Sequence, residues 1–516
     1  MAAQKEQVTV GGRNLVLSNL DKAMYPAGRF SKAQVIDYYI RISKYLLPHL
    51  KNRPVTLKRF PNGVRGEFFY EKDAAAFTPD WVKTFPVPRK ESRGADIRYI
   101  LINDLPTLVY LANLANLEIH PFLHRVPKIH RPTSIVFDLD PGEGANVLSC
   151  ARVAFLLRDV LRELQLESFT KVSGSKGLQL YVPLNSAVTY EATQPFAKAI
   201  ADLLAQQQPK LVVSQMSKAL RAKRIFIDWS QNSDFKTTAG VYSLRAKGNH
   251  PFVSLPVEWA ELEAAMSKND VDSLYFNPEQ AIARAKLKGD LFKPVLSLVQ
   301  KLPREVTAFL QKQAAQQKRL ADKQLTPYVR KRDFTKTKEP NPSIAGRSRQ
   351  GSRRRFVIQK HAASHLHYDF RLEMHNVLKS WAVPKGPPYK VSEPRLAMPT
   401  EDHPIDYLDF EGIIPKGQYG GGTVMVWDIG TYNLIEGNYY KGYLKFFLSG
   451  VKLKGEWTLQ RLPERDRDKW QLLKSGANTR SLSAKRDDQS ALTNRTMAEI
   501  RSAADAQWQS NRAPVR

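Results

Sequence analysis

The 516-residue sequence has very little cysteine and no long apolar run. Its one cysteine, Cys150, has no second thiol in the chain with which to form a disulfide, which suits a reducing cytoplasm. An uninterrupted apolar run of about 18 residues, the length that a membrane-spanning helix needs, is missing. The opening stretch "MAAQKEQVTV" also lacks the apolar segment of a secretory signal. We therefore expect a cytoplasmic protein without a membrane partner.

Acidic residues are also scarce relative to basic ones. The chain has 79 Lys and Arg against 50 Asp and Glu, which gives a net charge of +29 and a pI of about 9.9. Such a field attracts polyanions, because their binding releases condensed counterions. An anionic membrane is the alternative, but a basic amphipathic anchor helix is not evident. The balance favours nucleic acid.

The length and the changing texture predict several domains. Up to about residue 300, helical patterns (from Ser31, at 146–164 and around 193–206) alternate with short apolar strands such as "LQLYVPL" and "RIFIDW". "EPNPSIAGRSRQGSRRRF" then predicts an exposed basic linker. Beyond it, short apolar runs alternate with Gly-rich turns, which is typical of a small β-barrel or sandwich. We predict an α+β multidomain protein with an N-terminal α/β domain.

The strand "SIVFDLDPGEG" ends with two aspartates, Asp138 and Asp140. Side chains two apart on a strand share one face, about 6–7 Å from each other. Such a pair can hold two divalent cations for phosphoryl transfer, and Asp228, at the end of "RIFIDW", is a third candidate ligand. The alternative is that Asp140 only begins the turn at "DPGEG".

"KVSGSKGLQLYVP" predicts a tight loop between two strands. Its glycine amides, the Ser173 hydroxyl and Lys176 are the groups that a triphosphate needs. The Walker A spacing is absent. Without further support such a loop is more often a simple turn.

Together these segments resemble the polymerase domain of bacterial DNA ligase D, in the archaeo-eukaryotic primase superfamily. The resemblance covers about residues 5–295 and includes "LSNLDKAMYP", "PVTLKRFPNGV", "FFYEKDA", "LEIHPFLHR", "FDLDPG", "SGSKGLQLYVP", "RIFIDWSQN" and "KTTAGVYSLRA". It implies a primer-dependent polymerase that takes NTPs or dNTPs with Mn²⁺ or Mg²⁺.

The resemblance also implies roles for individual residues of this first domain. The metal ligands would be Asp138, Asp140 and Asp228, and the triphosphate contacts Ser173, Lys176 and Arg245. Contacts to DNA would come from Lys22 and Lys32 near a 5′-phosphate, from Phe69 and Tyr70 on template bases, and from Lys58, Arg59 and His120 in matching motifs. Gln179 stands where the family usually has histidine, which leaves only an amide donor for the nucleotide.

Histidines concentrate in "FVIQKHAASHLHYDFRLEM" and the stretch after it. Five of the ten lie between 361 and 403. If "LHYDFRL" is a strand, His367, Asp369 and Arg371 share one face, and His361 could complete a metal site. Two histidines and a carboxylate suit Mn²⁺ or Zn²⁺, and the arginine suits a phosphate. A purely structural cluster is the alternative.

Residues 328–497 resemble the 3′-phosphoesterase domain of DNA ligase D, through that string and "LKSWAVPKGPP", "EDHPIDYLDFEGIIPKGQYGGGTVMVWDIGTY" and "LKGEWTLQRL". The resemblance implies His361, His367 and Asp369 as metal ligands. It places Arg371, Lys385 and Arg395 around the phosphate, His403 as a transition-state donor or acid, and Glu401 and Tyr407 near it. Asp333 and Glu339, in "KRDFTKTKE", match acidic positions that the family uses before its barrel.

From these patterns we predict a polymerase domain at 1–300, a helical connector at 301–327, a phosphoesterase domain at 328–497 that contains the basic linker 340–355, and a tail at 498–516. The KxDG motif of an ATP-dependent ligase is absent from the sequence. The expected function is DNA end processing in bacterial non-homologous end joining, near the nucleoid. The expected substrates are ends with 5′-phosphate, 3′-phosphate or ribonucleotide termini, and the expected partners are a Ku-type protein and a separate ATP-dependent ligase. A non-catalytic DNA-end scaffold and a replication primase are the alternatives.

Overall fold

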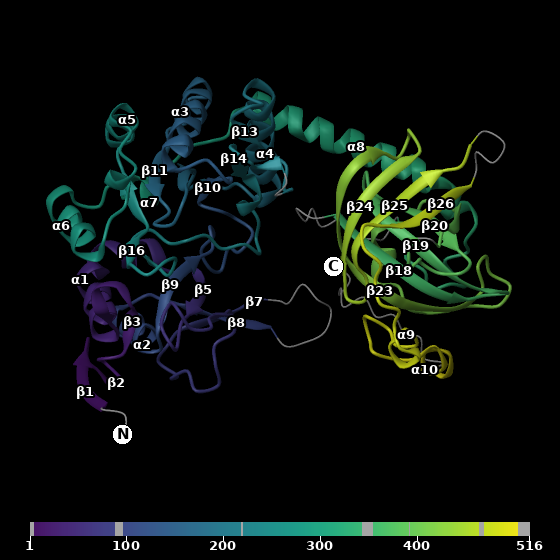
Figure 1. Ribbon diagram of the computed structural model, residues 1–516, viewed down its shortest axis with the longest axis horizontal. Helices are drawn as coiled ribbons and strands as arrows, with labels where there is room; N and C mark the ends of the chain where they lie inside the picture. The colour runs from purple at the N-terminus through teal and green to yellow at the C-terminus, as the bar shows by residue number, and fades with distance from the viewer. Residues whose placement is uncertain are drawn as a thin grey trace. The chain divides into compact units, whose positions relative to one another are not determined.

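The computed structural model describes residues 5–87, 96–217, 220–342, 354–391, 393–463 and 469–503. The chain divides into two compact units, residues 1–310 and 311–516, which are described separately (Figure 1). In the described part of the chain, no helix is both long and apolar enough to cross a lipid bilayer. Residues 343–353 of the predicted basic linker and 504–516 of the predicted tail lie outside the described ranges.

A six-stranded sheet forms the centre of the first unit. Its order is β13 (Val212–Val213), β14 (Ile225–Asp228), β10 (Ser134–Pro141), β12 (Leu178–Pro183), β11 (Phe169–Val172) and β17 (Leu255–Val257). All neighbours are antiparallel except β13 and β14. Helices α3 (Val147–Glu163) and α4 (Tyr190–Gln207) pack on it, and both confirm the helical patterns of the sequence. The run "SIVF" is buried, so β10 is anchored and its aspartates follow at its end.

A second sheet carries the aromatic and basic motifs of the first unit. Its strands are β6 (Phe69–Glu71), β5 (Pro54–Arg59), β8 (Ile97–Leu101) and β7 (Thr84–Val87), with β9 (Asn116–Pro121) also paired to β5. Helix α1 (Lys32–Leu50) begins at the predicted cap Ser31, which forms a capping box with Gln34.

Shorter elements complete the first unit, and helices α1 and α2 pack against each other. They are β1 (Lys5–Val10), β2 (Arg13–Ser18), β3 (Ala23–Tyr25), β4 (Phe30–Ser31), α2 (Leu105–Asn113), β15 (Leu244–Arg245), β16 (Phe252–Val253), α5 (Trp259–Lys268), α6 (Pro278–Lys288) and α7 (Pro294–Ser297).

The second unit is a closed eight-stranded barrel, which confirms the predicted small β domain. Its order is β18 (Arg354–Ala362), β19 (Leu366–Met374), β20 (Val377–Val383), β21 (Arg395–Pro399), β26 (Trp470–Ser475), β25 (Lys454–Arg461), β24 (Tyr443–Gly450) and β23 (Gly422–Asn438). Pairing of β18 with β23 closes the barrel, and β22 (Gly412–Ile414) extends β23. One core contains the tryptophans Trp381, Trp427, Trp457 and Trp470.

Alternation along the barrel strands separates two apolar clusters. Phe356 and Ile358 of β18 belong to the tryptophan core, whereas Val357 packs with Tyr328 and Tyr407 in a second cluster on the other face. Tyr328 lies near the end of helix α8 (Arg304–Arg330). The chain that follows α8 lies against this face, because the Tyr328 hydroxyl donates to the Pro340 carbonyl (2.9 Å). Short helices α9 (Ala484–Asp487) and α10 (Met497–Ser502) follow the last strand.

Candidate active sites

The three predicted aspartates of the first unit meet across two strands. Asp138 of β10 is the direct cross-strand partner of Asp228 on β14, and Asp140 lies two residues further along β10. Loss of solvent contact, followed by the charges of Asp140 and Asp228, raises the pKa of Asp138 to about 8. The pKa of Asp140 is raised by the same kind of desolvation and by Asp228. Carboxylates that repel one another in this way fit a site for divalent cations.

Asp228 is held by its own local turn. Its carboxylate accepts hydrogen bonds from the Ser230 amide (3.0 Å), the Ser230 hydroxyl and Gln231 Nε2 (3.1 Å), and Lys236 Nζ lies 3.9 Å away. These contacts fix the orientation of Asp228 toward β10.

Two further side chains lie at the next cross-strand positions of the same sheet, beside the Asp228–Asp138 pair. Gln179 on β12 pairs with Asp138, and Lys171 on β11 pairs with Gln179. Gln179 is buried and donates to Thr238 Oγ1 (2.8 Å), while its own oxygen is buried without a partner. The Gln179 amide nitrogen therefore already donates a hydrogen bond within the protein.

Lys171 is a functional candidate that sequence reasoning missed. It is fully buried, and its Nζ donates to Ser254 Oγ (2.6 Å). Burial and the charge of Arg245 lower its pKa to about 7, with Asp138 acting in the opposite direction. A lysine inside a short strand motif was the available signal, because such a charge is almost never buried without a reason.

The predicted triphosphate loop lies between β11 and β12. Ser173 Oγ accepts hydrogen bonds from the amides of Ser175 (3.2 Å) and Gly177 (3.1 Å), and Arg245 Nη1 donates to the Ser173 carbonyl (2.7 Å). Gly174 has φ +66°, and a Cβ there would lie 2.7 Å from the Val253 backbone. Lys176 is exposed at the tip. The structure thus brings Ser173, Lys176 and Arg245 together.

Glu118 links three of the residues predicted to contact DNA or the nucleotide and was not singled out from the sequence. It lies 2.8 Å from His120 Nε2, 3.2 Å from Arg245 Nε and 3.6 Å from Lys58 Nζ. Burial would raise the pKa of Glu118, but His120, Arg245 and Lys58 outweigh it and hold that pKa well below its usual range. Glu118 therefore orders the cations of Lys58 and Arg245 and the His120 imidazole, whose pKa is lowered by burial, beside the triphosphate loop.

The predicted stacking residues form an exposed aromatic surface on and beside β6. Phe69 is 45% exposed and Tyr70 is 56% exposed, and Phe68, which the sequence analysis did not name, is 50% exposed. Lys58 Nζ lies 4.1 Å from the Phe68 ring centre and Arg59 lies 5.1 Å from that of Phe69. Flat rings with cations beside them suit unpaired bases and their phosphates.

Lys22 and Lys32 are neighbours, but only one of them faces solvent. Lys22 is exposed and donates to Asn62 Oδ1 (2.9 Å). Lys32 is only 4% exposed and its ammonium donates to the Ser18 carbonyl. Burial, and then the charge of Lys22, lower the pKa of Lys32 to about 8. Lys22 is the more accessible of the two for a phosphate.

A second cluster lies on β18 and β19 of the barrel. His361 and His367 are cross-strand partners, and Asp369 follows two residues after His367 on the same face. In the described part of the chain, these three form the one set of at least three His, Cys, Asp or Glu ligands whose donor atoms all lie within 4.8 Å of one another. Antiparallel register thus places His361 beside the His367–Asp369 pair.

The donor atoms of this cluster are arranged for a metal ion. Asp369 lies 3.6 Å from His361 Nδ1 and 3.7 Å from His367 Nε2. His361 Nε2 is buried without a partner, and His367 Nδ1 can donate to the His365 carbonyl (3.0 Å), which leaves Nε2 free to bind. Burial would raise the pKa of Asp369, but Arg371, His361 and His367 lower it to about 2.

Arg371 connects the His361–His367–Asp369 cluster to His403. Its guanidinium donates to Asp369 Oδ2 (2.9 Å) and to Gln359 Oε1 (2.8 Å), and its Nη1 lies 2.9 Å from His403 Nδ1. His403 Nδ1 also lies 2.8 Å from the Glu401 carbonyl and 3.3 Å from the Ser380 hydroxyl. Burial, then the charges of Arg371 and Arg332, hold the pKa of His403 well below its usual range. The imidazole is neutral.

Arg332, in the segment after α8, is the residue of this site that sequence reasoning missed. Its guanidinium donates to Glu339 (2.7 Å) and Glu401 (2.9 Å) and lies 3.3 Å from His403 Nε2. Tyr407 donates to the same Glu339 carboxylate (2.8 Å). Arg332 thus joins Glu339, Glu401, His403 and Tyr407 in one buried network. The signal available was its place next to Asp333 in the segment "KRDFTKTKE".

Three predicted supporting residues lie apart from this network. Asp333 is exposed and binds its own turn, at Thr335 Oγ1 (2.6 Å) and Lys336 (3.2 Å). Arg395 donates to Glu393 (3.1 Å), and Lys385 is exposed. Among the described residues, no hydrogen bond or ion pair joins Lys385, Arg395 or Asp333 to Arg371, His403 or the metal cluster.

Comparison with protein families identifies both units. Residues 31–292, about half of the chain, match the family model described as "LigD, primase-polymerase domain", and residues 359–461 match "DNA Ligase D 3'-phosphoesterase domain".

Curated relatives and a solved structure agree with these matches. The chain is 41% identical over 418 residues to the multifunctional non-homologous end joining protein LigD of Mycolicibacterium smegmatis, over 81% of this chain and 51% of that protein. It is 38% identical over 473 residues to the corresponding repair protein of Mycobacterium tuberculosis, over 89% and 57%. The chain spans about half the length of these curated relatives.

The solved polymerase domain of Mycobacterium tuberculosis ligase D in complex with DNA is 37% identical to this chain. It matches with a TM-score of 0.51 over 55% of this chain and 99% of that one. The register of Asp138 with Asp228, the buried His361–His367–Asp369 cluster and these matches lead to one conclusion: the chain belongs to the LigD family and contains its primase-polymerase and 3′-phosphoesterase domains.

Proposed function

We propose that this chain prepares broken DNA ends for non-homologous end joining, with nucleotide addition in the first unit and 3′-end trimming in the second. The observation that carries the proposal is the presence of two sites in one chain. One contains three mutually repelling carboxylates, Asp138, Asp140 and Asp228, and the other a His–His–Asp cluster, and each has an arginine nearby that suits a phosphate. The two reactions complement each other, because trimming leaves the 3′-hydroxyl that extension needs.

In the first unit, Asp138, Asp140 and Asp228 would hold a pair of Mn²⁺ or Mg²⁺ ions. Bound ions supply positive charge for attack of a primer 3′-hydroxyl on the α-phosphate of a nucleotide. Ser173, Lys176 and Arg245 hold the triphosphate of an NTP or dNTP, with a preference for ribonucleotides. Lys22 and Lys32 would lie near a 5′-phosphate.

The aromatic surface of the first unit would grip the template. Phe69 and Tyr70 stack on unpaired bases, and Lys58, Arg59 and His120 follow the backbone beside them. The exposure of these rings supports this assignment, because a ring in a core could not stack on a base.

In the second unit, His361, His367 and Asp369 would hold one Mn²⁺ or Zn²⁺ ion, which withdraws charge from a 3′-phosphate. The set fits an ion, because His361 Nε2 is buried without a partner and Asp369 stays ionised. Arg371 orients the phosphate, and Lys385 and Arg395 add charge around it. A terminal ribonucleoside and then a 3′-phosphate are removed.

The neutral state of His403 defines its part in the second reaction. Neutral and with two arginines near the ring, the imidazole acts as a hydrogen-bonding group in the transition state. Arg332, Glu339, Glu401 and Tyr407 hold it in place. A cationic acid at this position would be opposed by both guanidinium charges.

The proposed partners supply the steps that the two units do not perform. A separate ATP-dependent DNA ligase would seal the strand. A Ku-type end-binding protein would bring the enzyme to the break.

Reciprocal variants test the proposal. Asp138→Asn should abolish primer extension on a gapped duplex with a 5′-phosphate and keep Mn²⁺-dependent phosphate release from a 3′-phosphorylated primer. His367→Ala should do the reverse, so each variant is the folding control for the other. Extension by Asp138→Asn equal to wild type would remove the polymerase assignment of the Asp138 site, and synthesis without any primer would indicate a primase.

A further inference from the structure

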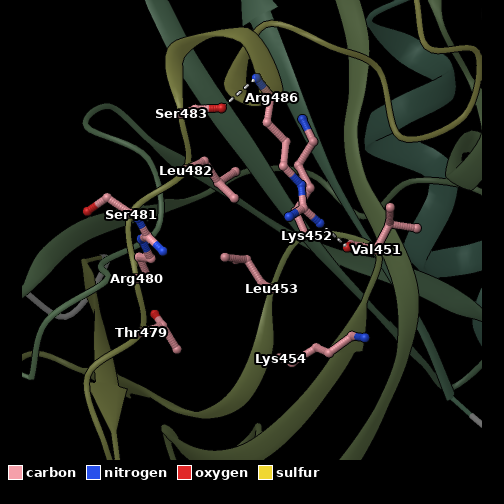
Figure 2. A pocket seen from close by; sticks show the side chains of 10 residues that line it. All are labelled: Val451, Lys452, Leu453, Lys454, Thr479, Arg480, Ser481, Leu482, Ser483 and Arg486. Atoms are coloured by element: carbon pink, nitrogen blue, oxygen red, sulfur yellow. Dashed lines mark hydrogen bonds between the residues drawn. The ribbon is translucent and has the colours of Figure 1, made fainter.

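A cavity of about 630 Å³ in the second unit is lined by four cationic side chains (Figure 2). Lys452 and Lys454 come from the turn between β24 and β25 and the start of β25, and Arg480 and Arg486 come from the segment that leads into and through α9. Acidic residues do not line the cavity. The cavity is also not lined by the His361–His367–Asp369 cluster or by the buried network around His403, so it is a separate site.

The positive charge of the cavity is not neutralised by close carboxylates. Within the described residues, no carboxylate oxygen forms an ion pair with any of the four side chains, although Asp487 and Asp428 act on Lys452 over longer range. Lys452 Nζ donates to the Gln489 carbonyl (2.6 Å) and Arg486 Nη2 to the Val451 carbonyl (3.1 Å). Neutral acceptors therefore orient these cations and leave their charge in place.

Both walls of the cavity are anchored to the barrel. Asp428 is fully buried and accepts hydrogen bonds from the amides of Lys452 (2.8 Å) and Leu453 (2.9 Å), which fixes the turn. On the other wall, Asp487 pairs with Lys360 (2.8 Å) and accepts from Trp427 Nε1 (3.0 Å). The cations are thus held on a preformed surface, which is what a binding site requires.

The chemistry of the lining matches phosphate groups attached to an apolar body. Arginine and lysine bind phosphate oxygens, and the hydroxyls of Ser481 and Ser483 add donors. Figure 2 shows Leu453 and Leu482 between the cationic walls; Leu453 is buried in the barrel core, whereas the half-buried Leu482 can contact a sugar or a base. Burial lowers the pKa of Lys452 to about 8 despite Asp487 and Asp428, so a bound anion would favour its charged form.

We propose that this cavity binds phosphate groups of a nucleic-acid strand, outside the catalytic cluster of the second unit. A strand is favoured over free phosphate, because the cationic side chains come from opposite walls of the cavity with the apolar Leu482 between them, where a free phosphate has no body to place. The cavity is connected to the β-strand β18, which carries His361. Lys360 directly precedes His361 on β18 and pairs with Asp487, the neighbour of the cavity residue Arg486. The cavity would hold the strand some nucleotides away from the 3′ end being trimmed.

Lysine footprinting on the full chain tests the proposal without using catalysis. A 3′-phosphorylated single-stranded 12-mer should protect Lys454 and Lys452 from an amine-reactive reagent, while Lys485, exposed on α9 but outside the cavity, stays reactive. Orthophosphate and ATP are the other two probes. Equal protection by either at the same concentration would overturn the strand assignment in favour of a free-phosphate site, and protection by none of the three would overturn the site itself.

Salt dependence provides a second, quantitative readout. Lys454→Ala/Arg480→Ala removes two exposed cations and should reduce the slope of log K against log salt for the 12-mer by about 0.7 for each lost contact. Lys485→Ala is the matched control and should leave the slope unchanged. Equal slopes for the double variant and the control would contradict the proposal.

Discussion

The two candidate catalytic centres balance their carboxylate charges in opposite ways. In the first unit Asp138, Asp140 and Asp228 face one another, and the pKa of Asp138 is raised to about 8. In the second unit Asp369 is surrounded by Arg371 and two histidines, and its pKa is lowered to about 2. The first centre therefore needs cations to relieve repulsion, whereas the second keeps its carboxylate ionised before any metal binds.

The largest expected effect follows from removing the charge of Asp369 in the second unit. Asp369→Asn removes the partner of Arg371 and leaves a buried guanidinium uncompensated, which costs about 3–5 kcal/mol. We expect loss of phosphate release together with a lower melting temperature of the barrel, measured by thermal unfolding without metal. A variant as stable as wild type would show that Arg371 finds another partner. Lys336→Ala, beside exposed Asp333, is the control and should be neutral.

The same substitution in the repelling centre should have the opposite sign. Asp138→Asn removes a charge that repels Asp140 and Asp228, so the metal-free protein should gain about 1–2 kcal/mol at pH 8, after allowance for solvent screening. Primer extension should fall by at least about a hundredfold, because metal binding is lost. Thermal unfolding in a chelator measures the first effect, and a destabilised variant would contradict the repulsion described above.

The pH dependence of the two centres should also differ. Folded Asp138 keeps a proton up to about pH 8, while the unfolded side chain loses it near its ordinary value of 3.8. Its contribution to stability therefore falls as pH rises from about 4 to 8. Asp369 contributes stability above about pH 4 that is lost as pH falls toward 2.

Metal addition makes this difference measurable. Mn²⁺ should raise the melting temperature of the first unit more at pH 8 than at pH 5, because the carboxylates then repel most strongly. Asp138→Asn should remove most of that dependence. An equal rise of the melting temperature with Mn²⁺ at pH 5 and pH 8 would contradict the proposed difference between the two centres.

The smallest expected effect concerns the row beside Asp138. Gln179→His would place an imidazole donor where the amide is now used by Thr238, and we expect the KM for the nucleotide to fall by about two- to fivefold with kcat little changed. Steady-state primer extension at varied nucleotide concentration measures both constants. Thr238→Val is the comparison: if it alone lowers KM, release of the existing glutamine explains the effect.

Local pattern was sufficient for several features of both units. Ser31 begins α1 as its capping position predicts, and the apolar run before Asp138 forms a buried strand. Alternation also places His367, Asp369 and Arg371 on one face of β19. These features depend on neighbours within a few residues, which the sequence shows directly.

Features that depend on register or on distant segments could not be read in this way. Arg332 reaches His403 only because the segment after α8 packs on the barrel, and Glu118 of β9 gathers Lys58 from β5 and Arg245 from β15. The single buried lysine beside the aspartates, Lys171, is recognised only when β11, β12 and β10 are aligned.

By itself, the sequence determined which residue types are present and their spacing along each strand, and from these the α/β unit, the β domain and two groups of candidate ligands. Only the tertiary structure decided that Asp138 faces Asp228, that His361 faces His367, and that His403 is neutral between two arginines. The reason is physical: strand spacing is local, whereas register, burial and the charge around a side chain come from segments far apart in the chain.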